Sequence, residues 1–417
     1  MDADRIDPRK ERGLALVKGK GKSIKHVAGN IWFVPSQTVP GGGYAVDAGK
    51  ATCSCPDFET TCGKRCKHLW AVLYVRREVA MPDGTTVVSE TVHRIAYSQH
   101  SSYNQAQCEE KDRVQILLHG LCDGIVQPKQ ERGRPRVALR DVVYGATMKV
   151  YGTMSGRRSM SDLRASERDN HVTRAPSYNS IFRYIERPEL MPLFKSLVNE
   201  SAKPLRAIED SFAIDSTSFA TTTYARWFDH KYGQENKTQR WVKAHVMVGT
   251  RTNIMTAVEA TDNDVGDSTM FKPLIEETAA NGFTLKEVSA DKAYLSHANL
   301  ALVEQYGAAP FVPFKSNSSS TGSPAWERMY HLFSADKEYF ATKYHKRSNV
   351  EASFGAMKKK FGAAVRSKLL PAQLNEVLLK CLCFNLSILV HSIHELGIDP
   401  KFWTAMAPKT PLPEMGP

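Results

Sequence analysis

The spacing of hydrophobic residues changes near residue 205. Beyond it, short apolar runs alternate with segments of helical periodicity, which is typical of an α/β domain. Strands are predicted at residues 211–215, 241–248, 253–260, 286–289 and 309–312. Helices are predicted at residues 267–281, 295–306, 326–361 with a break, and 371–397. The last helix is apolar nearly all round, which indicates a core position or a dimer contact.

The first half of the chain has a different pattern. Strands at 31–34 and 44–46 and a helix at 67–75 indicate a compact unit behind a mobile basic arm. Later helices at 108–122, at 139–151 and from 177 favour a helix-turn-helix-like module. The predicted parts are an arm (1–25), a small domain (26–78), a helical DNA-binding region (79–204) with a basic linker (127–136), an α/β domain (205–397) and a tail (398–417).

Charge and composition narrow the class of protein. Of the 417 residues, 56 are Lys or Arg and 44 are Asp or Glu, which gives a net charge of +12. Such an excess favours a polyanionic partner, nucleic acid above all, although solubility alone would also account for it. The first twenty residues lack the apolar core of a signal peptide, and the longest apolar run, 381–390, is too short to cross a membrane. We therefore expect a cytoplasmic protein, nucleoid-associated in a prokaryote, with no membrane partner.

Two predicted strands end in an acid. Asp215 follows the apolar run at 211–214, and Asp291 follows the one at 286–290. An open sheet presents its ligands at the ends of its strands, so both carboxylates are candidates for one site. Either Asp alone is also consistent with a turn or a helix cap.

A row of polar residues lies farther along the chain. Tyr344, Arg347, Glu351 and Lys358 are spaced so that they fall within about 60° of one another on a helix. The adjacent sector is apolar and holds Val350, Phe354, Met357 and Phe361. Between residues 343 and 368 there are eight Lys or Arg and one acid, Glu351. A single acid in a basic helix indicates a metal ligand beside a phosphate-binding surface, whereas a solvated helix usually mixes its charges.

The spacing Tyr-x2-Arg-x3-Glu-x6-Lys resembles the signature of insertion-sequence DDE transposases. Asp291-Lys292-Ala293-Tyr294 is similar to their second-Asp motif, with Ala293 as a departure, and Asp215 resembles their first Asp. The resemblance covers residues 205–395, about half of the chain. It implies a ribonuclease-H-like mixed sheet flanked by helices, with a modest insertion near 313–342.

The resemblance also implies a chemistry. Cleavage and transfer of a phosphodiester suit two Mg²⁺ (or Mn²⁺) ions held by carboxylates. Asp215 is expected to bridge both ions, and Asp291 and Glu351 to hold one each. Arg347 and Lys358, and less clearly Lys292, are expected to bind phosphate, with Tyr344 near the cleaved end. The acids of the 262–267 loop are interpreted as turn and cap residues.

Cysteine and histidine cluster near the N-terminus. Cys53, Cys55, Cys66 and His68 form a Cys₃His set suited to one tetrahedral, structural Zn²⁺, and Cys62 is a competing thiol. Cys-x-Cys-x(n)-Cys-x-His after two strands resembles the SWIM zinc finger. That family is linked to DNA or protein binding and occurs beside transposase domains.

Two further basic segments are candidates for DNA contact. Arg132 and Arg134, in Arg-Gly-Arg-Pro, match the core of an AT-hook that reads a narrow minor groove, although four residues also match by chance. Residues 224–232 interleave aromatics and cations, as in a base-stacking surface or an inward-packed hairpin.

Together these features predict a DNA transposase. It would bind the ends of a mobile element as double-stranded DNA, cut them and join them to target DNA, working as a homodimer or higher oligomer. A nuclease on the same fold without strand transfer, and a DNA-binding regulator derived from a transposase, remain as alternatives.

Overall fold

The computed structural model describes residues 8–20, 23–28, 30–37, 42–60, 65–75, 78–80, 86–88, 101–130, 133, 135–221 and 241–403. The chain divides into two compact units, Met1–Tyr97 and Ser98–Pro417.

The first unit packs helices on a small antiparallel sheet. The sheet has the order β1 (Lys25–Ala28), β2 (Ile31–Pro35), β3 (Gly43–Asp47) and β4 (Thr52–Cys53). Trp32 and Val34 of β2 are buried while their neighbours Ile31 and Phe33 are partly exposed, so one sheet face forms the core. The helices are α1 (Pro8–Lys20), α2 (Pro56–Thr60) and α3 (Lys67–Val75), and a hairpin of β5 (Glu78–Ala80) and β6 (Thr86–Val88) follows.

The expected mobile arm is wrong for residues 8–20, which form α1 and pack against α3. Leu16 of α1 is buried in the core of this unit. Gly13 lets the two helices approach closely, because a Cβ there would lie 2.6 Å from the Cβ of Trp70. The sequence analysis did not predict this helix, because lysines and glycines interrupt the residues of its apolar face.

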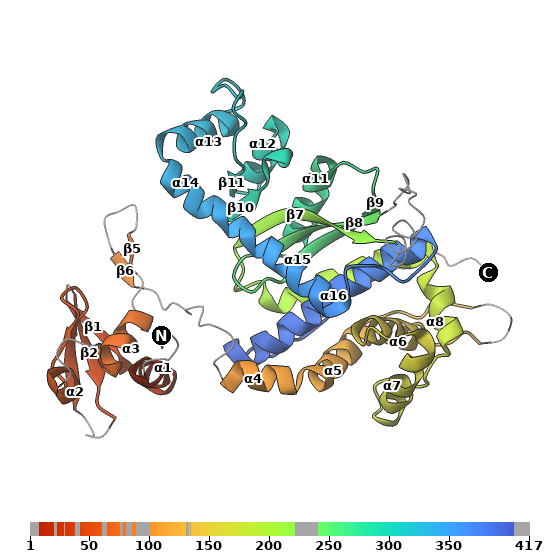
Figure 1. Cartoon of the computed structure of the whole chain (residues 1–417), viewed down its shortest axis with the longest axis horizontal. Coiled ribbons are helices and arrows are strands. Elements are labelled where there is room, and N and C mark those ends of the chain that lie inside the picture. Colours follow the sequence, from red (N-terminus) through yellow and green to blue (C-terminus); the bar gives the residue numbers. More distant parts are fainter. Residues whose placement is uncertain are drawn as a thin grey trace, which may run out of the picture. The chain divides into compact units, whose positions relative to one another are not determined.

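The second unit contains a five-stranded mixed sheet in the order β11-β10-β7-β8-β9. The strands are β7 (Ser211–Ala220), β8 (Trp241–Gly249), β9 (Met255–Asp262), β10 (Glu287–Ala290) and β11 (Ala309–Phe311). β7, β8 and β9 run antiparallel to one another, and β10 and β11 run parallel to β7. This is the predicted ribonuclease-H-like sheet, and Figure 1 shows helices on both of its sides.

Helices before and after the sheet share one core with it. Those before it are α4 (Ser101–Cys108), α5 (Glu110–Cys122), α6 (Leu139–Tyr151), α7 (Gly156–Arg168), α8 (Tyr178–Ile185) and α9 (Met191–Ala202). Those within or after it are α11 (Phe271–Ala280), α12 (His297–Gln305), α13 (Pro324–Ala335), α14 (Lys337–Tyr344), α15 (Ser348–Phe361) and α16 (Leu370–Leu396). The expected boundary near residue 204 therefore does not separate two cores.

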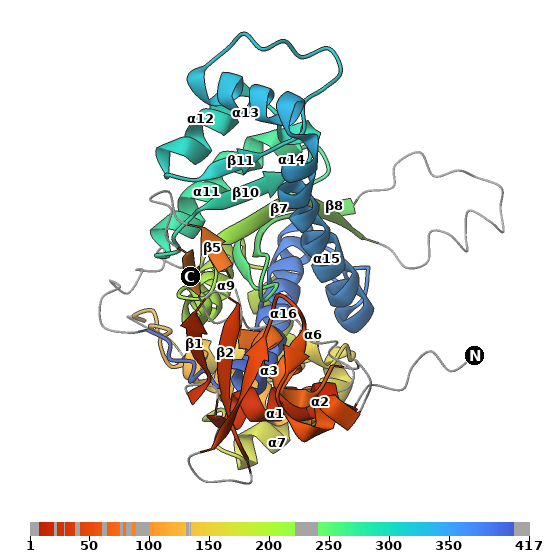
Figure 2. The same cartoon turned by 90° about the vertical axis from the view of Figure 1, so that its left-hand side faces the viewer.

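The central element of this unit is α16, which packs against α9, α4, α6, α5 and strand β9 (Figures 1 and 2). It is long and apolar enough to cross a membrane, but 78% of its most apolar window is buried inside the fold. Its fully buried Asn385 accepts a hydrogen bond from the Met255 N–H and donates to the oxygens of Met255, Val198 and Ser201. Of the two expected roles of this helix, the core position is confirmed.

Candidate active site

Strands β7 and β10 place two acids side by side. The strands are parallel, and Ala290 pairs with Ile214, so Asp291 and Asp215 follow in adjacent positions. The prediction that the first strand ends at Asp215 is wrong, because β7 continues to Ala220 beside β8. β10 ends at Ala290, which pairs with Ile214, so from Asp215 onward β7 is no longer paired with β10. This end of β10 is where a ligand can reach both carboxylates.

Glu351 reaches the same place from a helix. It lies in the first turn of α15, where a negative charge is favoured by the helix dipole. The apolar stripe predicted for this helix is buried, with Val350 and Met357 at 0% exposure. The single helix face predicted for the four polar residues is interrupted: Tyr344 ends α14, and a tighter 3₁₀ turn, η7 (His345–Arg347), precedes α15.

One guanidinium joins two of the three acids. Arg347 Nη1 lies 2.6 Å from Asp215 Oδ2, and its Nη2 lies 2.6 Å from Glu351 Oε1. Asp215 also accepts a hydrogen bond from the Ser216 N–H at 2.9 Å, and Asp291 accepts one from the Lys292 N–H. The structure therefore brings together acids from two strands and a later helix around one cation.

The charges at this site are unbalanced. Burial raises the pKa of Asp215, and the nearby charges of Asp291 and Glu351 raise it further, against the Ser216 N–H and Arg347. Burial opposes the charge on Arg347, yet the surrounding acids, Asp215 foremost, raise its pKa. Three carboxylates face one guanidinium, so the site retains negative charge and oxygen ligands of the kind that Mg²⁺ and Mn²⁺ prefer. The residues present thus fit divalent metal ions.

The predicted zinc ligands also converge. The ligand atoms of Cys53, Cys55, Cys66 and His68 all lie within 4.8 Å of one another, and all four residues are buried. Zn–S bonds of about 2.3 Å place two sulfurs about 3.8 Å apart, so small shifts would close a tetrahedron. Hydrogen bonding to Cys53 lowers the pKa of Cys66 to about 4, while the same contact raises that of Cys53. Cys62 lies outside the described residues.

Comparison with protein families agrees with both sites. Residues 207–386 match the family described as "Transposase DDE domain", and residues 39–77 match the "SWIM zinc finger" family. Residues 207–386 thus form a transposase DDE domain, and the protein is a DNA transposase. The Cys₃His cluster is accordingly the structural zinc site of its SWIM finger.

The transposase is also similar to one solved structure, titled as a cryo-EM structure of a piggyBac transposase synaptic complex with hairpin DNA. The sequence identity is 12%, the match covers 69% of this chain and 77% of that chain, and the TM-score is 0.35.

Behind the carboxylates the transposase has a hydrogen-bond network that the sequence analysis did not predict. Asp267, in the 3₁₀ turn η5 (Asp267–Met270), accepts hydrogen bonds from Ser216 Oγ at 2.8 Å and from Lys243 Nζ at 3.1 Å. Its Oδ1 lies 3.7 Å from Nδ1 of the fully buried His245. Burial opposes the charge on Asp267, but Ser216 and Lys243 outweigh it and lower its pKa. The interpretation of Asp267 as a cap residue only is therefore wrong.

This network was visible in part from the sequence. Ser216 pairs with His245 across β7 and β8, and Lys243 lies two residues earlier on the same side of β8. A Lys and a His spaced by two in an otherwise apolar strand were the available signal. Tyr294, in η6 (Lys292–Tyr294), is nearly fully buried near the same acids. Its pKa is raised by burial and by the charges of Asp267, Asp215 and Asp291.

The basic residues around Glu351 differ in their contacts. Lys343 and Lys346 form ion pairs with Glu287, and Lys360 pairs with Glu110. Lys358 lies with its Nζ 5.4 Å from the ring centre of Phe219, and burial lowers its pKa.

The remaining predicted site residues are less constrained. Lys292 is exposed beside Asp291, and the Arg347 guanidinium lies 5.9 Å from the ring centre of the half-buried Tyr344. Arg132, Arg134 and residues 224–232 lie outside the described residues.

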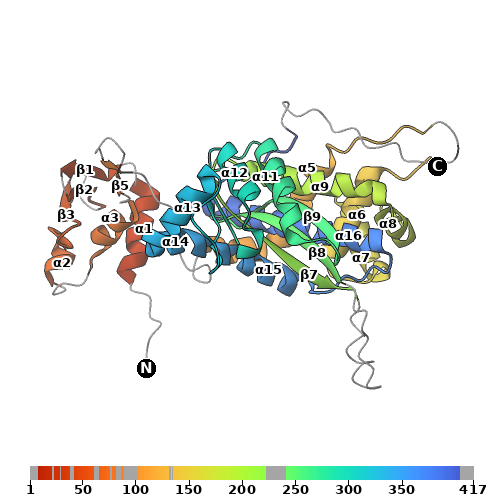
Figure 3. The same ribbon diagram turned by 90° about the horizontal axis from the view of Figure 1, so that it is seen from above.

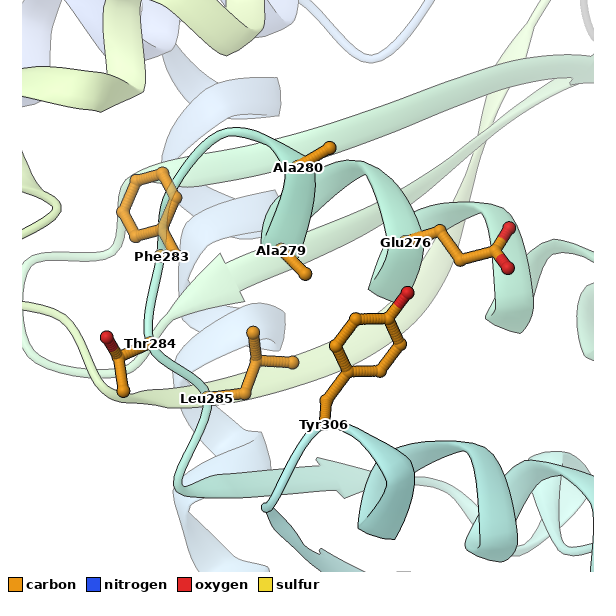
Figure 4. Close-up of a pocket in the computed structure, with 7 residues that line it drawn as sticks. All are labelled: Glu276, Ala279, Ala280, Phe283, Thr284, Leu285 and Tyr306. Carbon is orange, nitrogen blue, oxygen red and sulfur yellow. The ribbon is translucent and has the colours of Figure 1, made fainter.

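A shallow pocket of about 440 Å³ lies elsewhere in the second unit (Figure 4). It is lined by Glu276, Ala279, Ala280, Phe283, Thr284, Leu285 and Tyr306. Leu285 precedes β10, whereas Asp291 follows it, so the pocket lies at the opposite end of that strand. Its lining mixes polar and apolar side chains, and Figure 4 shows the Glu276 carboxylate pointing away from the others. The pocket is therefore separate from the carboxylate site.

Proposed function

We propose that Asp215, Asp291 and Glu351 are the catalytic metal ligands with which this transposase cuts the ends of its element and joins them to target DNA. The observation that supports this is the Arg347 guanidinium, which contacts both Asp215, 132 residues away, and Glu351. Acids so far apart in sequence are brought around a cation at the open end of the sheet, where a DNA strand can approach.

The chain's own residues suit this reaction. The charges of both other acids act on Asp215, so it is the candidate ligand that two ions would share. Two Mg²⁺ or Mn²⁺ ions held here would supply activation of the attacking oxygen and stabilisation of the leaving oxygen. Arg347, Lys358 and Lys292 are the candidates for phosphate contact, because a guanidinium or ammonium group donates strong hydrogen bonds to phosphate oxygens. Tyr344, beside Arg347, is placed to contact the cleaved end.

DNA recognition and assembly belong to the same proposal. The positive charge and the SWIM finger support contact with double-stranded DNA outside the carboxylate site. Joining two ends requires that both be held at once, so we propose a homodimer or higher oligomer on DNA. We place the protein in the cytoplasm, on the nucleoid if the host is prokaryotic.

The decisive experiment is cleavage of supercoiled DNA carrying the element's ends with Mg²⁺. Glu351→Gln should lose cleavage by at least about 10²-fold and retain DNA binding, because a carboxylate ligand is lost and the fold is kept. The matched control is Glu338→Gln, an equal charge change on the exposed face of α14. Equal cleavage by wild type and Glu351→Gln would exclude Glu351 as a ligand.

The same assay separates the remaining functions. Joined product with target DNA identifies a transposase reaction, and cutting without joining identifies a nuclease. A folded wild-type protein that binds the ends and never cuts them is a regulator.

A further inference from the structure

Helix α7 has two faces of opposite character. Its buried residues are Gly156, Ser159, Leu163 and Ser166. At about 100° per residue, Arg157, Arg164 and Arg168 fall within about 40° of one another on the side facing away from them. Arg158 lies at the edge of the same exposed side. We call these four residues the α7 arginine face.

The α7 arginine face is unusual because it contains no acid. Solvated helices generally intersperse charges of both signs. The acids of α7 lie toward its flanks: Asp162 forms an ion pair with Lys111 at 3.3 Å, and Glu167 is only partly exposed. Within the part of the chain that the structure describes, none of the four arginines forms an ion pair. Four guanidinium groups with no acid among them give this surface a positive charge that suits an external anion.

The helix that carries this face is held firmly. Ser166 accepts a hydrogen bond from Gln115 at 3.1 Å and one from Tyr144, both buried. Gly156 allows close packing on α8, since a Cβ there would lie 2.4 Å from the Phe182 ring. The guanidinium of Arg157 lies 5.9 Å from the ring centre of Tyr178. A rigid support lowers the entropy cost of ordering arginine side chains on a ligand.

We propose that the α7 arginine face binds the phosphate backbone of duplex DNA outside the catalytic site. From Arg157 to Arg168 the helix rises by about 16 Å, which matches about five base pairs of DNA. Arginine binds phosphate with two hydrogen bonds, and all four cations of the face are arginine rather than lysine. The proposal rests on the proposed function, since a transposase must hold DNA beyond the cut.

The location agrees with a holding role. α7 packs against α6 and α8 and lies at the outer edge of the helical layer (Figure 1). Viewed from above, α7 and α8 lie toward the end of the second unit away from α12 and α13 (Figure 3). Contacts from this face would be to phosphate and would not distinguish sequences.

The test is equilibrium binding of the full-length protein to a random-sequence duplex of about 40 base pairs, without metal, across about 50 to 200 mM salt. The variant carries Arg157→Gln, Arg164→Gln and Arg168→Gln. The control carries Lys272→Gln, Lys286→Gln and Arg328→Gln, an equal charge change at exposed sites in the same unit. Losing three phosphate contacts should lower affinity at least about tenfold. Raising the salt from about 50 to about 200 mM weakens binding by some factor in each protein. That factor should be about 40-fold smaller in the variant than in wild type.

Three results would overturn the proposal: unchanged affinity and salt dependence in the α7 variant, an equal loss in the control, or no duplex binding by wild type. If the variant does not fold, modification of wild-type arginines by phenylglyoxal decides, and DNA should protect Arg157, Arg164 and Arg168. Failure to protect them would contradict the proposal. Failure of the carboxylate proposal is distinguishable, because it would leave this binding intact and show only in cleavage.

Discussion

At the scale of single residues, Arg347 lies against two of the three acids of the site. Like charges placed together raise one another's pKa and destabilise the fold unless a cation lies between them. The guanidinium meets this need for Asp215 and Glu351 at 2.6 Å each. Arg347, for which we propose a phosphate contact, is therefore also a partner of two of the proposed metal ligands.

Asp267 is expected to act as a positioning residue for Asp215. It fixes Ser216, whose N–H donates to Asp215, and it neutralises Lys243. Asp267→Asn removes the negative charge that binds the Ser216 hydroxyl and the Lys243 ammonium group. We expect the rate of DNA cleavage to fall by about 10–100-fold. The concentration of Mn²⁺ needed for half-maximal binding, followed by the paramagnetic signal of the free ion, should rise by a similar factor.

The control for this prediction is Asp264→Asn in the same loop, where the side chain is exposed and bonds only Asn263 among the described residues. A loss of activity in Asp267→Asn with unchanged Mn²⁺ binding would show that Asp267 supports the fold and not the site.

Residue types on a strand or helix were predictable, but their partners were not. Asp215, Asp291 and Glu351 could be named as candidates because an acid after or within an apolar pattern is visible in the sequence alone. Lys346 stands out in the sequence only as one of eight cations between residues 343 and 368, whereas in the structure it pairs with Glu287 on another element. Asp267 looked like a loop acid for the same reason, because its contacts come from β7 and β8, far away in sequence.

The Glu287 cluster predicts a pH dependence of stability. Burial alone would raise the pKa of Glu287, but hydrogen bonds from Lys343 and Lys346 outweigh it and hold the pKa below 4.5. A lowered pKa means that the unfolded chain binds the proton more tightly. The stabilisation is therefore present above about pH 4.5 and is lost as the pH falls through the lowered value.

Urea unfolding of Glu287→Gln measures this contribution. At about pH 7 the variant should be less stable than wild type by about 1–2 kcal/mol, a modest value because the groups are partly exposed. The difference should shrink as the pH falls below 4.5 and vanish once it has passed the lowered pKa of Glu287. A difference that stays constant across this range would mean that packing, and not charge, is lost in the variant.

At the scale of elements, the end of α15 depends on a side chain from α16. The buried Lys380 Nζ donates to the carbonyl oxygens of Phe361 and Gly362 at 2.7 Å and of Ala364 at 2.9 Å. These carbonyls are at or just beyond the end of α15, where no backbone partner follows. Gly362 has φ +85, a left-handed conformation that favours glycine and turns the chain away from the helix.

Lys380→Met keeps the volume of the side chain and removes its donors. Three carbonyl groups would lose their partner, and we expect the free energy of unfolding to fall by about 3–4 kcal/mol. Urea unfolding gives this value directly. Lys359→Met, at an exposed position of α15, is the control and should change stability by less than about 0.5 kcal/mol. A fall of similar size in both variants would indicate an effect of hydrophobicity and not of the lost cap.

Element types were more predictable than element ends. Apolar runs located all five strands of the large sheet, since a buried strand has a strong pattern. β7 was predicted too short because Ser216, Thr217 and Ser218 are polar, yet pairing with β8 continues through them. α7 was not predicted: its 13 residues include four arginines and only a narrow buried side. Its helical form depends on α6 and α8, which the local sequence does not contain.

At the scale of the whole molecule, two separate cores imply two separate stabilities. The core of the first unit consists of Leu16, Ile24, Trp32, Val34, Val46, Cys53, Cys55, Cys66, Leu69, Ala71, Val72 and Val75. Three of these are zinc ligands, so the metal site and the hydrophobic core are one structure. A hydrophobic core of this size stabilises the folded unit by only a few kcal/mol. Zinc binding contributes a folding free energy on the order of 10 kcal/mol.

Removal of zinc should therefore unfold the first unit and spare the second. Scanning calorimetry of the full-length protein should show two transitions, of which a chelator abolishes only the one from the SWIM finger. Cys66→Ser should have the same effect and should lower the zinc content from one atom per chain, whereas Cys108→Ser, at an exposed cysteine of α4, should change neither. Binding through α7, which lies in the second unit, should persist in the chelated protein at low salt. A chelator that shifted both transitions together would instead mean that the two units stabilise each other, and the zinc site would then influence catalysis through the fold of the sheet.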